Sequence, residues 1–339
     1  MARPLLAIVG STSLLGRELR DLLEEKPLPA TIRLIGAEDE ATLTLTEHAG
    51  EPVVMTGLDE DTLRDASLIL LAGSSASSRK ACEILERTGA RGALVDLTAF
   101  CEDSPRARLR APMLEAPGCT WPADAIHVIA HPAAIALALF FARVHRRYRI
   151  RRSLVHVFEP ASERGREGVE ELKEQTVSLL TFKHVPKRVF DEQLGFNILA
   201  RYGSEAPESL EQFELRIERH LATLLAAREA PPMPSLRLIQ APVFHGHSFS
   251  VWAEFDTRCA PEELEQALAN QQIDVRGADL EAPTAVGIAG QSGLAVGAIR
   301  PDRNNPRAIW FWLVVDNLRI VAENALTAAE ALLRGGDAS

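Results

Sequence analysis

Short, uninterrupted apolar runs in the N-terminal part of the chain restrict its fold more than any other feature of the sequence. Five such runs alternate with segments of helical apolar spacing or with loops. A strand that is apolar at every position is buried on both faces, and strands that alternate with helices build a parallel sheet. The pattern therefore predicts an α/β domain with a doubly wound parallel sheet. The predicted strands cover residues 5–9, 32–36, 67–73, 93–97 and 126–130.

The pattern of apolar and polar residues changes at about residue 135, after which longer segments alternate between the two kinds. Alternation with a period of two is typical of strands that bury one face. Polar helices are predicted between them over 168–180 and 210–228. We therefore expect a second, α+β domain with an open, largely antiparallel sheet. Its predicted strands are 153–158, 236–243, 248–255 and 308–315, and a last helix is predicted over 317–334.

Charge and composition exclude several classes of protein. The 339 residues carry a formal net charge of −10, so nucleic-acid binding has no electrostatic support. The arginine-rich stretch 143–152 is interpreted as a solvated edge or a subunit surface. No apolar run approaches the roughly 20 residues of a membrane span, and no leader segment is expected at the N-terminus. Four scattered cysteines without metal-ligand spacing favour a cytoplasmic location.

A glycine-containing loop follows the first predicted strand and leads into a helix. Such loops hold the phosphates of dinucleotides, because glycine permits close backbone approach and the helix N-terminus attracts anions. Two interpretations stay open, a nucleotide site and a plain strand-to-helix turn. The acidic Glu38 would bond a ribose hydroxyl and repel a 2′-phosphate, which favours NAD over NADP. The candidate cofactor-binding residues are Gly10, Ser11, Thr12, Ser13, Leu14, Gly16, Glu38, Gly73 and Asn317.

Five stretches in this order resemble the aspartate-semialdehyde dehydrogenase family, and within it the divergent Usg-like paralogues that lack the catalytic cysteine. The stretches are 7–16, 129–132, 159–175, 241–248 and 315–319. The resemblance covers nearly the whole chain. It implies a Rossmann-type NAD(P)-binding domain over 1–132 and 317–339, and a catalytic and dimerisation domain over 133–316. It also implies a homodimer built through the sheet of the second domain.

The resemblance further implies a reaction, the NAD(P)-dependent reductive dephosphorylation of aspartyl phosphate in amino-acid biosynthesis. The family's nucleophilic cysteine corresponds to Ala134, and a methyl group cannot attack a carbonyl. His247 corresponds to the family's general base and is retained, while Glu159 replaces its active-site glutamine. The family's anion-binding arginines and lysine correspond to three further substitutions, at Cys101, Gln240 and Glu214. Ser13 likewise replaces the middle glycine of the phosphate loop.

Two functions follow from these substitutions. The favoured one is a catalytically inactive, dimeric scaffold or nucleotide-binding protein whose small-molecule ligand is unknown. The alternative is an active NAD-dependent oxidoreductase that uses His247 on an altered substrate. Cys119 is interpreted as an incidental loop cysteine. His131, His245 and His247 lie near one another in the family motifs, and His245 and His247 are expected to share one side of a strand, but no metal is expected.

Overall fold

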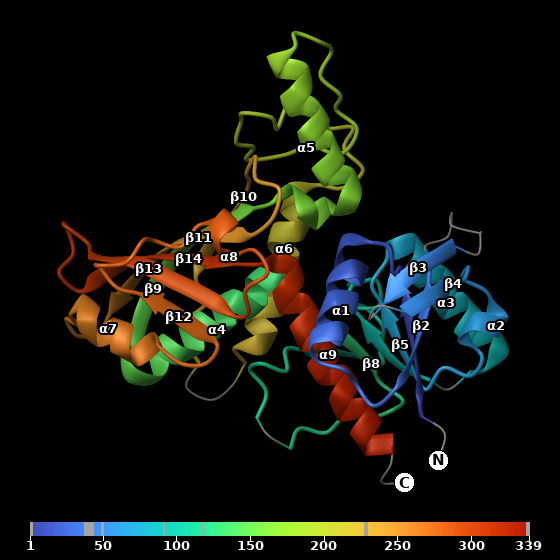
Figure 1. The fold of residues 1–339 in the computed structure, drawn as a ribbon. Helices are drawn as coiled ribbons and strands as arrows, with labels where there is room; N and C mark the ends of the chain where they lie inside the picture. Colours follow the sequence, from blue (N-terminus) through green and yellow to red (C-terminus); the bar gives the residue numbers. More distant parts are fainter. Residues whose placement is uncertain are drawn as a thin grey trace. The chain divides into compact units, whose positions relative to one another are not determined.

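Figure 1 shows the computed structural model of the chain, which describes residues 3–36, 44–48, 51–90, 92–116, 118–226 and 230–336. The chain separates into two compact units. The first unit comprises Met1–Ala130 with Val321–Ser339, and the second comprises His131–Ile320. Each unit contains one six-stranded sheet.

The first unit is built on a sheet with the strand order β2-β1-β5-β6-β8-β7, in which every neighbouring pair is parallel. The strand order turns at β1 and β5, so the crossover helices lie on both faces. The predicted doubly wound α/β fold is therefore confirmed. The strands are β1 (Leu5–Val9), β2 (Thr31–Ile35), β5 (Leu68–Leu71), β6 (Ala93–Asp96), β7 (Ala107–Arg110) and β8 (Ile126–Ile129), with a hairpin of β3 (Thr44–His48) and β4 (Glu51–Met55).

Helices cover both faces of this sheet. On one face α2 (Glu60–Leu63) and α3 (Ser75–Thr88) contribute buried side chains to a core shared with alternate residues of the strands. Figure 1 shows α1 (Leu14–Glu25) and α9 (Asn317–Gly336) on the opposite face. Serine side chains cap the N-termini of α1 and α3, which satisfies amides that the helices leave open.

The second unit contains a mixed sheet with the order β10-β9-β11-β14-β13-β12. Its three central pairs are antiparallel and its two outer pairs are parallel, which confirms the expected largely antiparallel sheet. The strands are β9 (Ile150–Glu159), β10 (Ser235–Gln240), β11 (His247–Phe255), β12 (Ile273–Arg276), β13 (Leu294–Pro301) and β14 (Ala308–Val315). The helices are α4 (Pro132–Arg147), α5 (Gly165–Leu180), α6 (Leu210–Leu224), α7 (Pro261–Leu268) and α8 (Ala285–Ile288), with a single 3₁₀ turn, η1 (Ala161–Arg164).

Helix α4 forms the centre of the second unit's core. Every residue from Pro132 to Phe141 is buried, because the helix is apolar on all sides. Phe140 packs edge-on against Phe311 of β14, with ring centroids 4.9 Å apart. His131 is the N-cap residue of this helix and Pro132 occupies its first turn, where proline fits without loss of a hydrogen bond.

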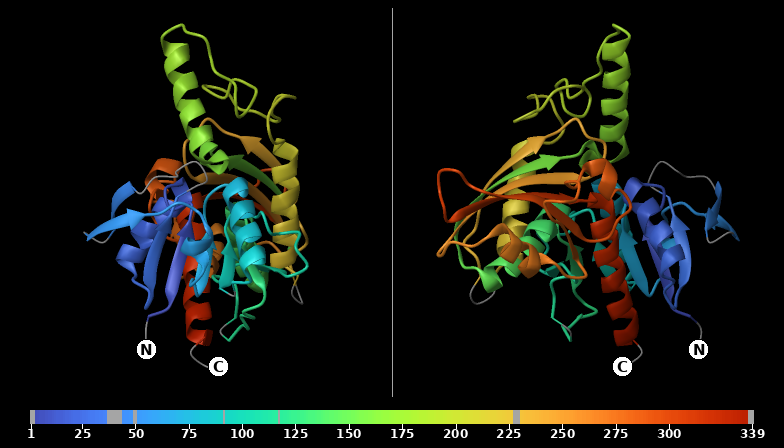
Figure 2. Two further views of the ribbon diagram at one scale, coloured as in Figure 1. Left: turned by 90° about the vertical axis from the view of Figure 1, so that its right-hand side faces the viewer. Right: turned by 60° about the vertical axis from the view of Figure 1, so that its left-hand side comes forward.

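The other face of this sheet is aromatic and partly open to solvent. Trp310 and Trp312 lie on the side of β14 opposite Phe311, and Trp310 is 37% exposed. Trp252 pairs with Trp310 across the antiparallel β11–β14 ladder. Both indole N–H groups donate to the same Asp302 carboxylate oxygen, at 2.9 and 3.0 Å. Helix α5 and the loop after it project from the sheet (Figure 2) and expose Phe182 almost completely.

Some element bounds differ from those predicted. Strand β10 ends at Gln240 rather than at residue 243, because Pro242 cannot donate to a ladder. The predicted helix at 210–228 ends at Leu224. The sequence patterns missed β3, β4, β7 and β12, which are short or lie at sheet edges, and also the eight-residue inner strand β13. Among the described residues, no helix is both long and apolar enough to cross a membrane.

Candidate functional site

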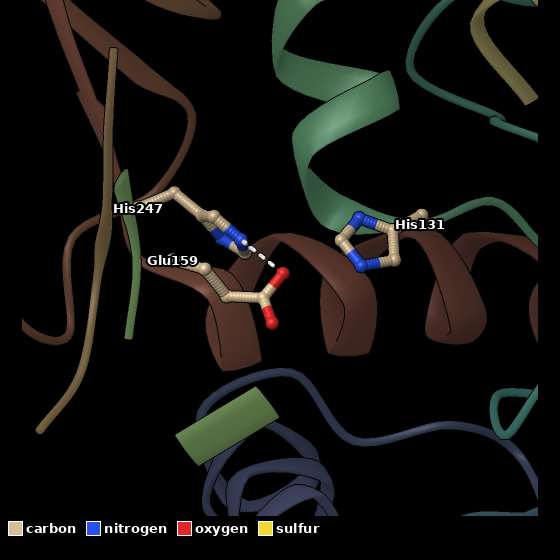
Figure 3. Close-up of side chains that lie close together, drawn as sticks. All are labelled: His131, Glu159 and His247. Atoms are coloured by element: carbon tan, nitrogen blue, oxygen red, sulfur yellow. Dashed lines mark ion pairs between the residues drawn. The ribbon is translucent and has the colours of Figure 1, made fainter. Parts of the chain in front are cut away.

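Three buried side chains converge in the second unit, His131, Glu159 and His247 (Figure 3). His131 precedes α4, Glu159 ends β9, and His247 begins β11. Because β9 and β11 are antiparallel and Ser248 pairs with Phe158, the register brings the end of β9 beside the start of β11. The ligand atoms of the three residues lie within 4.8 Å of one another. The cluster is thus a product of sheet register and of a helix N-terminus.

A buried ion pair holds Glu159. The Arg164 guanidinium donates to Oε1 of Glu159 at 2.6 Å, and the two side chains are 4% and 0% exposed. The guanidinium also stacks on the ring of Phe213, 3.2 Å from its centroid. Burial opposes ionisation of Glu159, but Arg164 and His247 together outweigh it and keep the pKa of this carboxyl below its ordinary value. Glu159 is therefore a carboxylate at neutral pH.

A second carboxyl group, Glu163, lies against both histidines. Its Oε2 is 3.4 Å from Nε2 of His131, and its Oε1 is 4.0 Å from Nδ1 of His247. The amide of Asn317 donates to Oε1 at 2.7 Å and fixes the orientation of the group. Burial and the neighbouring charge of Glu159 raise the pKa of Glu163. The site therefore pairs a carboxylate with a carboxyl group that ionises less readily.

His131 is held by backbone bonds. The backbone N–H of His131 donates to Nδ1 of the buried His220 at 3.0 Å. The ring Nδ1 of His131 accepts from the backbone N–H of Ala133 at 3.2 Å. Burial, together with the nearby His247 and His220, lowers the pKa of His131 well below its ordinary value. The imidazole of His131 is therefore neutral at physiological pH.

His247 is fully buried and stacks on Phe249, with ring centroids 5.9 Å apart. Within the part of the chain that the structure describes, neither of its ring nitrogens has a hydrogen-bond partner. Its Nε2 faces Oε2 of Glu159 at 4.0 Å, and that oxygen also lacks a hydrogen bond. Unsatisfied buried polar atoms are rare in folded proteins, so their concentration here marks the site.

The candidate nucleophile position is a buried methyl group. Ala134 lies in the first turn of α4 and has no exposed surface. Gln240 and Glu214, which stand at positions expected to have lost anion-binding groups, form hydrogen bonds within the protein. The Gln240 amide donates to the Glu159 carbonyl and accepts from the Tyr202 hydroxyl. The Glu214 carboxylate accepts from the Leu238 N–H at 2.6 Å.

The glycine loop lies in the first unit and is tightly packed. Gly10 has a φ of +80°, and a Cβ there would lie 2.2 Å from the Cα of Gly73. A Cβ on Gly16 would lie 2.2 Å from the Gly10 carbonyl oxygen. Ser13 accepts from the Gly16 N–H at 2.8 Å and donates to the Ala72 carbonyl at 2.6 Å. Ser11 donates to the Ile35 carbonyl. The loop is therefore bound internally at three of its predicted cofactor positions.

The other predicted cofactor residues are spread over the molecule. Thr12 and Leu14 lie with Ser11 and Ser13 at the start of α1, whereas Glu38 lies outside the described residues. Asn317 belongs to the second unit, where it bonds Glu163, Ser162 and the Gly246 N–H. The structure thus places Asn317 with the histidine cluster.

One prediction at the cluster is wrong. His245 does not share a strand face with His247, because β11 begins only at His247. Gly246 between them has a φ of +87°, which breaks the alternation of a strand. His245 is half-buried, and burial lowers its pKa. His220, Glu163 and Arg164 were not predicted, since isolated polar residues on helices and turns carry no periodic signal.

The cysteines do not supply a nucleophile in the second unit. Residues 131–320 contain a single cysteine, Cys259, which is buried. It follows the far end of β11, and the strand from His247 to Phe255 spans about 27 Å. In the first unit Cys82 and Cys101 face each other with sulfur atoms 3.6 Å apart, and Cys119 is exposed.

Comparisons with known proteins agree with the fold. Residues 142–320 match the family model described as the semialdehyde dehydrogenase dimerisation domain. The chain is 31% identical to a USG-1 protein homolog from Pseudomonas aeruginosa, over 98% of this chain and 99% of that protein. It is 26% identical to an aspartate-semialdehyde dehydrogenase from Prochlorococcus marinus, over 98% and 96% of the two chains.

Solved structures share the same architecture. A probable aspartate-semialdehyde dehydrogenase from Pseudomonas aeruginosa superposes with a TM-score of 0.85 at 28% identity, covering 98% of this chain and 99% of that one. An aspartate-semialdehyde dehydrogenase from Candida albicans, solved with NADP, has a TM-score of 0.66 at 15% identity and covers 98% of each chain. A parallel α/β unit and a mixed-sheet unit in one chain are the architecture that these solved dehydrogenases share. The chain belongs to the semialdehyde dehydrogenase family.

Proposed function

We propose that this protein is a homodimeric member of the family that does not carry out the family's dehydrogenase reaction. The observation that carries the proposal is the buried methyl group of Ala134 in the first turn of α4. A covalent acyl intermediate needs a nucleophilic heteroatom at that place, activated by the helix N-terminus and a base. No cysteine of the second unit replaces it, since Cys259 lies beyond the far end of β11.

The charges of the site support the same proposal. A phosphorylated or carboxylated substrate needs fixed cations, and arginine is the usual one. Gln240 is neutral and its amide is already bonded to Tyr202 and to the Glu159 carbonyl. Arg164 is a cation, but its charge is engaged by Glu159 at 2.6 Å. The family reaction has therefore lost both its nucleophile and its anion-binding groups.

Turnover assays test this proposal. The purified protein is incubated with aspartate semialdehyde, phosphate and NAD or NADP, and formation of the reduced nicotinamide is followed by absorbance. We expect no turnover above the uncatalysed background, at any protein concentration. We also expect none from Ala134→Cys, because the anion-binding groups are missing too, and none from the matched control Ala134→Ser. Turnover by the unaltered protein would overturn the proposal. Hydride transfer that does not need phosphate would favour the alternative, an NAD-dependent oxidoreductase that uses His247 without a covalent intermediate.

Nucleotide binding in the first unit is a second part of the proposal. The close packing of Gly10 against Gly73 is the geometry of a strand-to-helix phosphate loop, and the N-terminal amides of α1 favour an anion. Ser13 narrows the loop with its side chain. We propose weak binding, with NAD preferred to NADP. A thermal shift with NAD, NADP and AMP measures it, since a ligand that binds only the folded state raises its stability.

Homodimer formation is the third part. The matched domain is described as a dimerisation domain, and its sheet presents a half-exposed aromatic face with Trp252, Trp310 and Trp312. Helix α5 and the loop after it add further exposed apolar side chains: Val177, Leu180, Phe182, Phe196 and Ile198. Exposed apolar surfaces of this kind mark protein interfaces. Sedimentation equilibrium should give a dimer. Phe182→Ser should weaken it without unfolding the monomer, because Phe182 is 98% exposed.

A further inference from the structure

The buried cluster of His131, Glu159 and His247 has the composition of a metal site. Two imidazoles and one carboxylate are ligands that suit zinc and its neighbours in the first transition row, and three such ligands are common in zinc sites that keep an open position. All three side chains are buried, at 8%, 0% and 0% exposure. Figure 3 shows the Glu159 carboxylate pointing into the space between the two rings.

The atoms that would bind a cation have no other hydrogen-bond partner among the described residues. They are Nε2 of His131, Oε2 of Glu159 and Nε2 of His247. Burying a polar atom without a partner is unfavourable, so each of these atoms would gain from a ligand. Three different elements contribute them, and each directs its free atom toward the others.

We propose that this cluster binds one divalent transition-metal ion, with Zn²⁺ as the best match to its ligands. The ion is held by Nε2 of His131, Oε2 of Glu159 and Nε2 of His247. Zinc bonds of about 2.0–2.2 Å place neighbouring ligand atoms roughly 3.4 Å apart in a tetrahedron. The ligand atoms here lie within 4.8 Å of one another, so small side-chain rotations close the site.

Glu163 completes the arrangement from outside the ligand set. When Nε2 of His247 binds the ion, Nδ1 of the same ring carries the proton. In the structure this Nδ1 lies 4.0 Å from Oε1 of Glu163. A carboxylate that accepts from the second nitrogen of a metal-bound histidine orients the ring and strengthens the ligand. Asn317 holds this carboxylate in place through its bond of 2.7 Å.

The charges around the cluster permit a dication. Glu159 and Glu163 provide two carboxyl groups, and the opposing cations are the guanidinium of Arg164 on Oε1 of Glu159 and the nearby Arg216. Oε2 of Glu159 is left for the ion. His131 gives up a weak bond, because coordination by Nε2 puts the ring proton on Nδ1 and displaces the Ala133 N–H at 3.2 Å. Nε2 of His131 also leaves its 3.4 Å contact with Oε2 of Glu163, so two weak contacts are replaced by three metal–ligand bonds.

Metal binding by the purified full-length protein tests the proposal without any activity assay. The protein is stripped with a chelator, dialysed against ZnCl₂, and analysed for bound zinc, and Co²⁺ is then added to record its visible absorption. We expect one equivalent of zinc, a tetrahedral Co²⁺ spectrum and a thermal stability that rises with Zn²⁺. His247→Gln and His131→Asn should each lower the affinity at least tenfold, and asparagine at 131 keeps an N-cap side chain.

His245→Gln is the matched control, because His245 is two residues from His247 but outside the cluster. It should retain zinc like the unaltered protein, and circular dichroism of the stripped variants shows that they fold. Unaltered protein that binds no zinc, or zinc binding that survives both His247→Gln and His131→Asn, overturns the proposal. A buried water would then be what satisfies these atoms. Zinc binding and absence of dehydrogenase turnover are measured separately, so either proposal can fail alone.

Discussion

Two fully buried histidines, one in each unit, differ in whether their ring nitrogens form hydrogen bonds. In the first unit the glycine loop and the buried His127 are satisfied internally: Arg110 donates to Nδ1 of His127 at 3.2 Å, and the Pro122 carbonyl lies 3.1 Å from its Nε2. In the second unit His247 is equally buried, yet neither ring nitrogen has a hydrogen bond among the described residues. Satisfied groups specify a fold, whereas unsatisfied ones indicate a place kept for a ligand.

The largest loss of stability is expected when the buried ion pair of Glu159 and Arg164 in the second unit is broken. Glu159→Gln leaves the buried guanidinium of Arg164 with only the exposed Glu208 carboxylate, 3.5 Å away, as an ion-pair partner. It should lower the free energy of unfolding by about 3–5 kcal/mol. Urea denaturation measures this. The matched control is Glu174→Gln, which breaks the exposed pair with Arg188 and should cost less than about 1 kcal/mol. Equal costs for the two variants would show that burial of the pair does not matter.

A glycine pair in the first unit gives the next largest effect. Gly10→Ala places a Cβ 2.2 Å from the backbone of Gly73 at a φ of +80°, and should cost about 2–4 kcal/mol through overpacking and strain. Gly89→Ala is the control, because its φ is +66° but no atom lies within 4 Å of the added Cβ. It should cost about 1 kcal/mol. A cost for Gly10→Ala no larger than the control would contradict the tight packing of the loop.

The pH dependence of the free energy of unfolding tests the buried histidine of the first unit, His127. Burial, aided by the charge of Arg110, lowers the pKa of His127 to about 4. The unfolded chain binds this proton below pH of about 6.5, so stability is complete above that pH and falls as the pH drops toward about 4. The slope from His127 is at most about 1.4 kcal/mol per pH unit. His131 adds loss of the same sign in the second unit.

Denaturation curves at a series of pH values check this, and His127→Gln should remove the contribution of the first unit. An unchanged slope in that variant would mean that His127 is not the group that titrates.

The smallest effect concerns Ser13 and the nucleotide loop. Ser13→Ala removes the cap of α1 and should cost about 1 kcal/mol, whereas Ser13→Gly should cost only a few tenths. Ser13→Gly also opens the loop, so the thermal shift with NAD should increase. A shift that stays the same in Ser13→Gly would show that Ser13 does not limit nucleotide binding.

The sequence predicted the fold well, because the spacing of apolar residues distinguishes buried strands, half-buried strands and helices. The continuous apolar runs gave β1, β5 and β6 to within a few residues, and the aromatic strand 308–315 was predicted with its observed bounds. Edge strands such as β7 and β12 have mixed faces and only four residues, so no period is visible in them.

The candidate site was predicted only in part. His247, Glu159 and Ala134 were identified through family motifs, but Glu163 and Arg164 come from a 3₁₀ turn that no pattern announces. The convergence of His131 with His247 depends on the β9–β11 register and on the entry of α4. The expectation of a shared face for His245 failed at one glycine, because the positive φ of Gly246 interrupts the extended backbone that alternation requires.

The position of the tryptophans has a practical consequence. Of the four in the chain, Trp252, Trp310 and Trp312 gather on one face of the second unit's sheet, and only Trp121 lies in the first unit. Indole emission shifts to the blue when water is removed. The wavelength of the intrinsic tryptophan emission therefore reports whether that face is covered. It can be followed without a label while the protein is diluted.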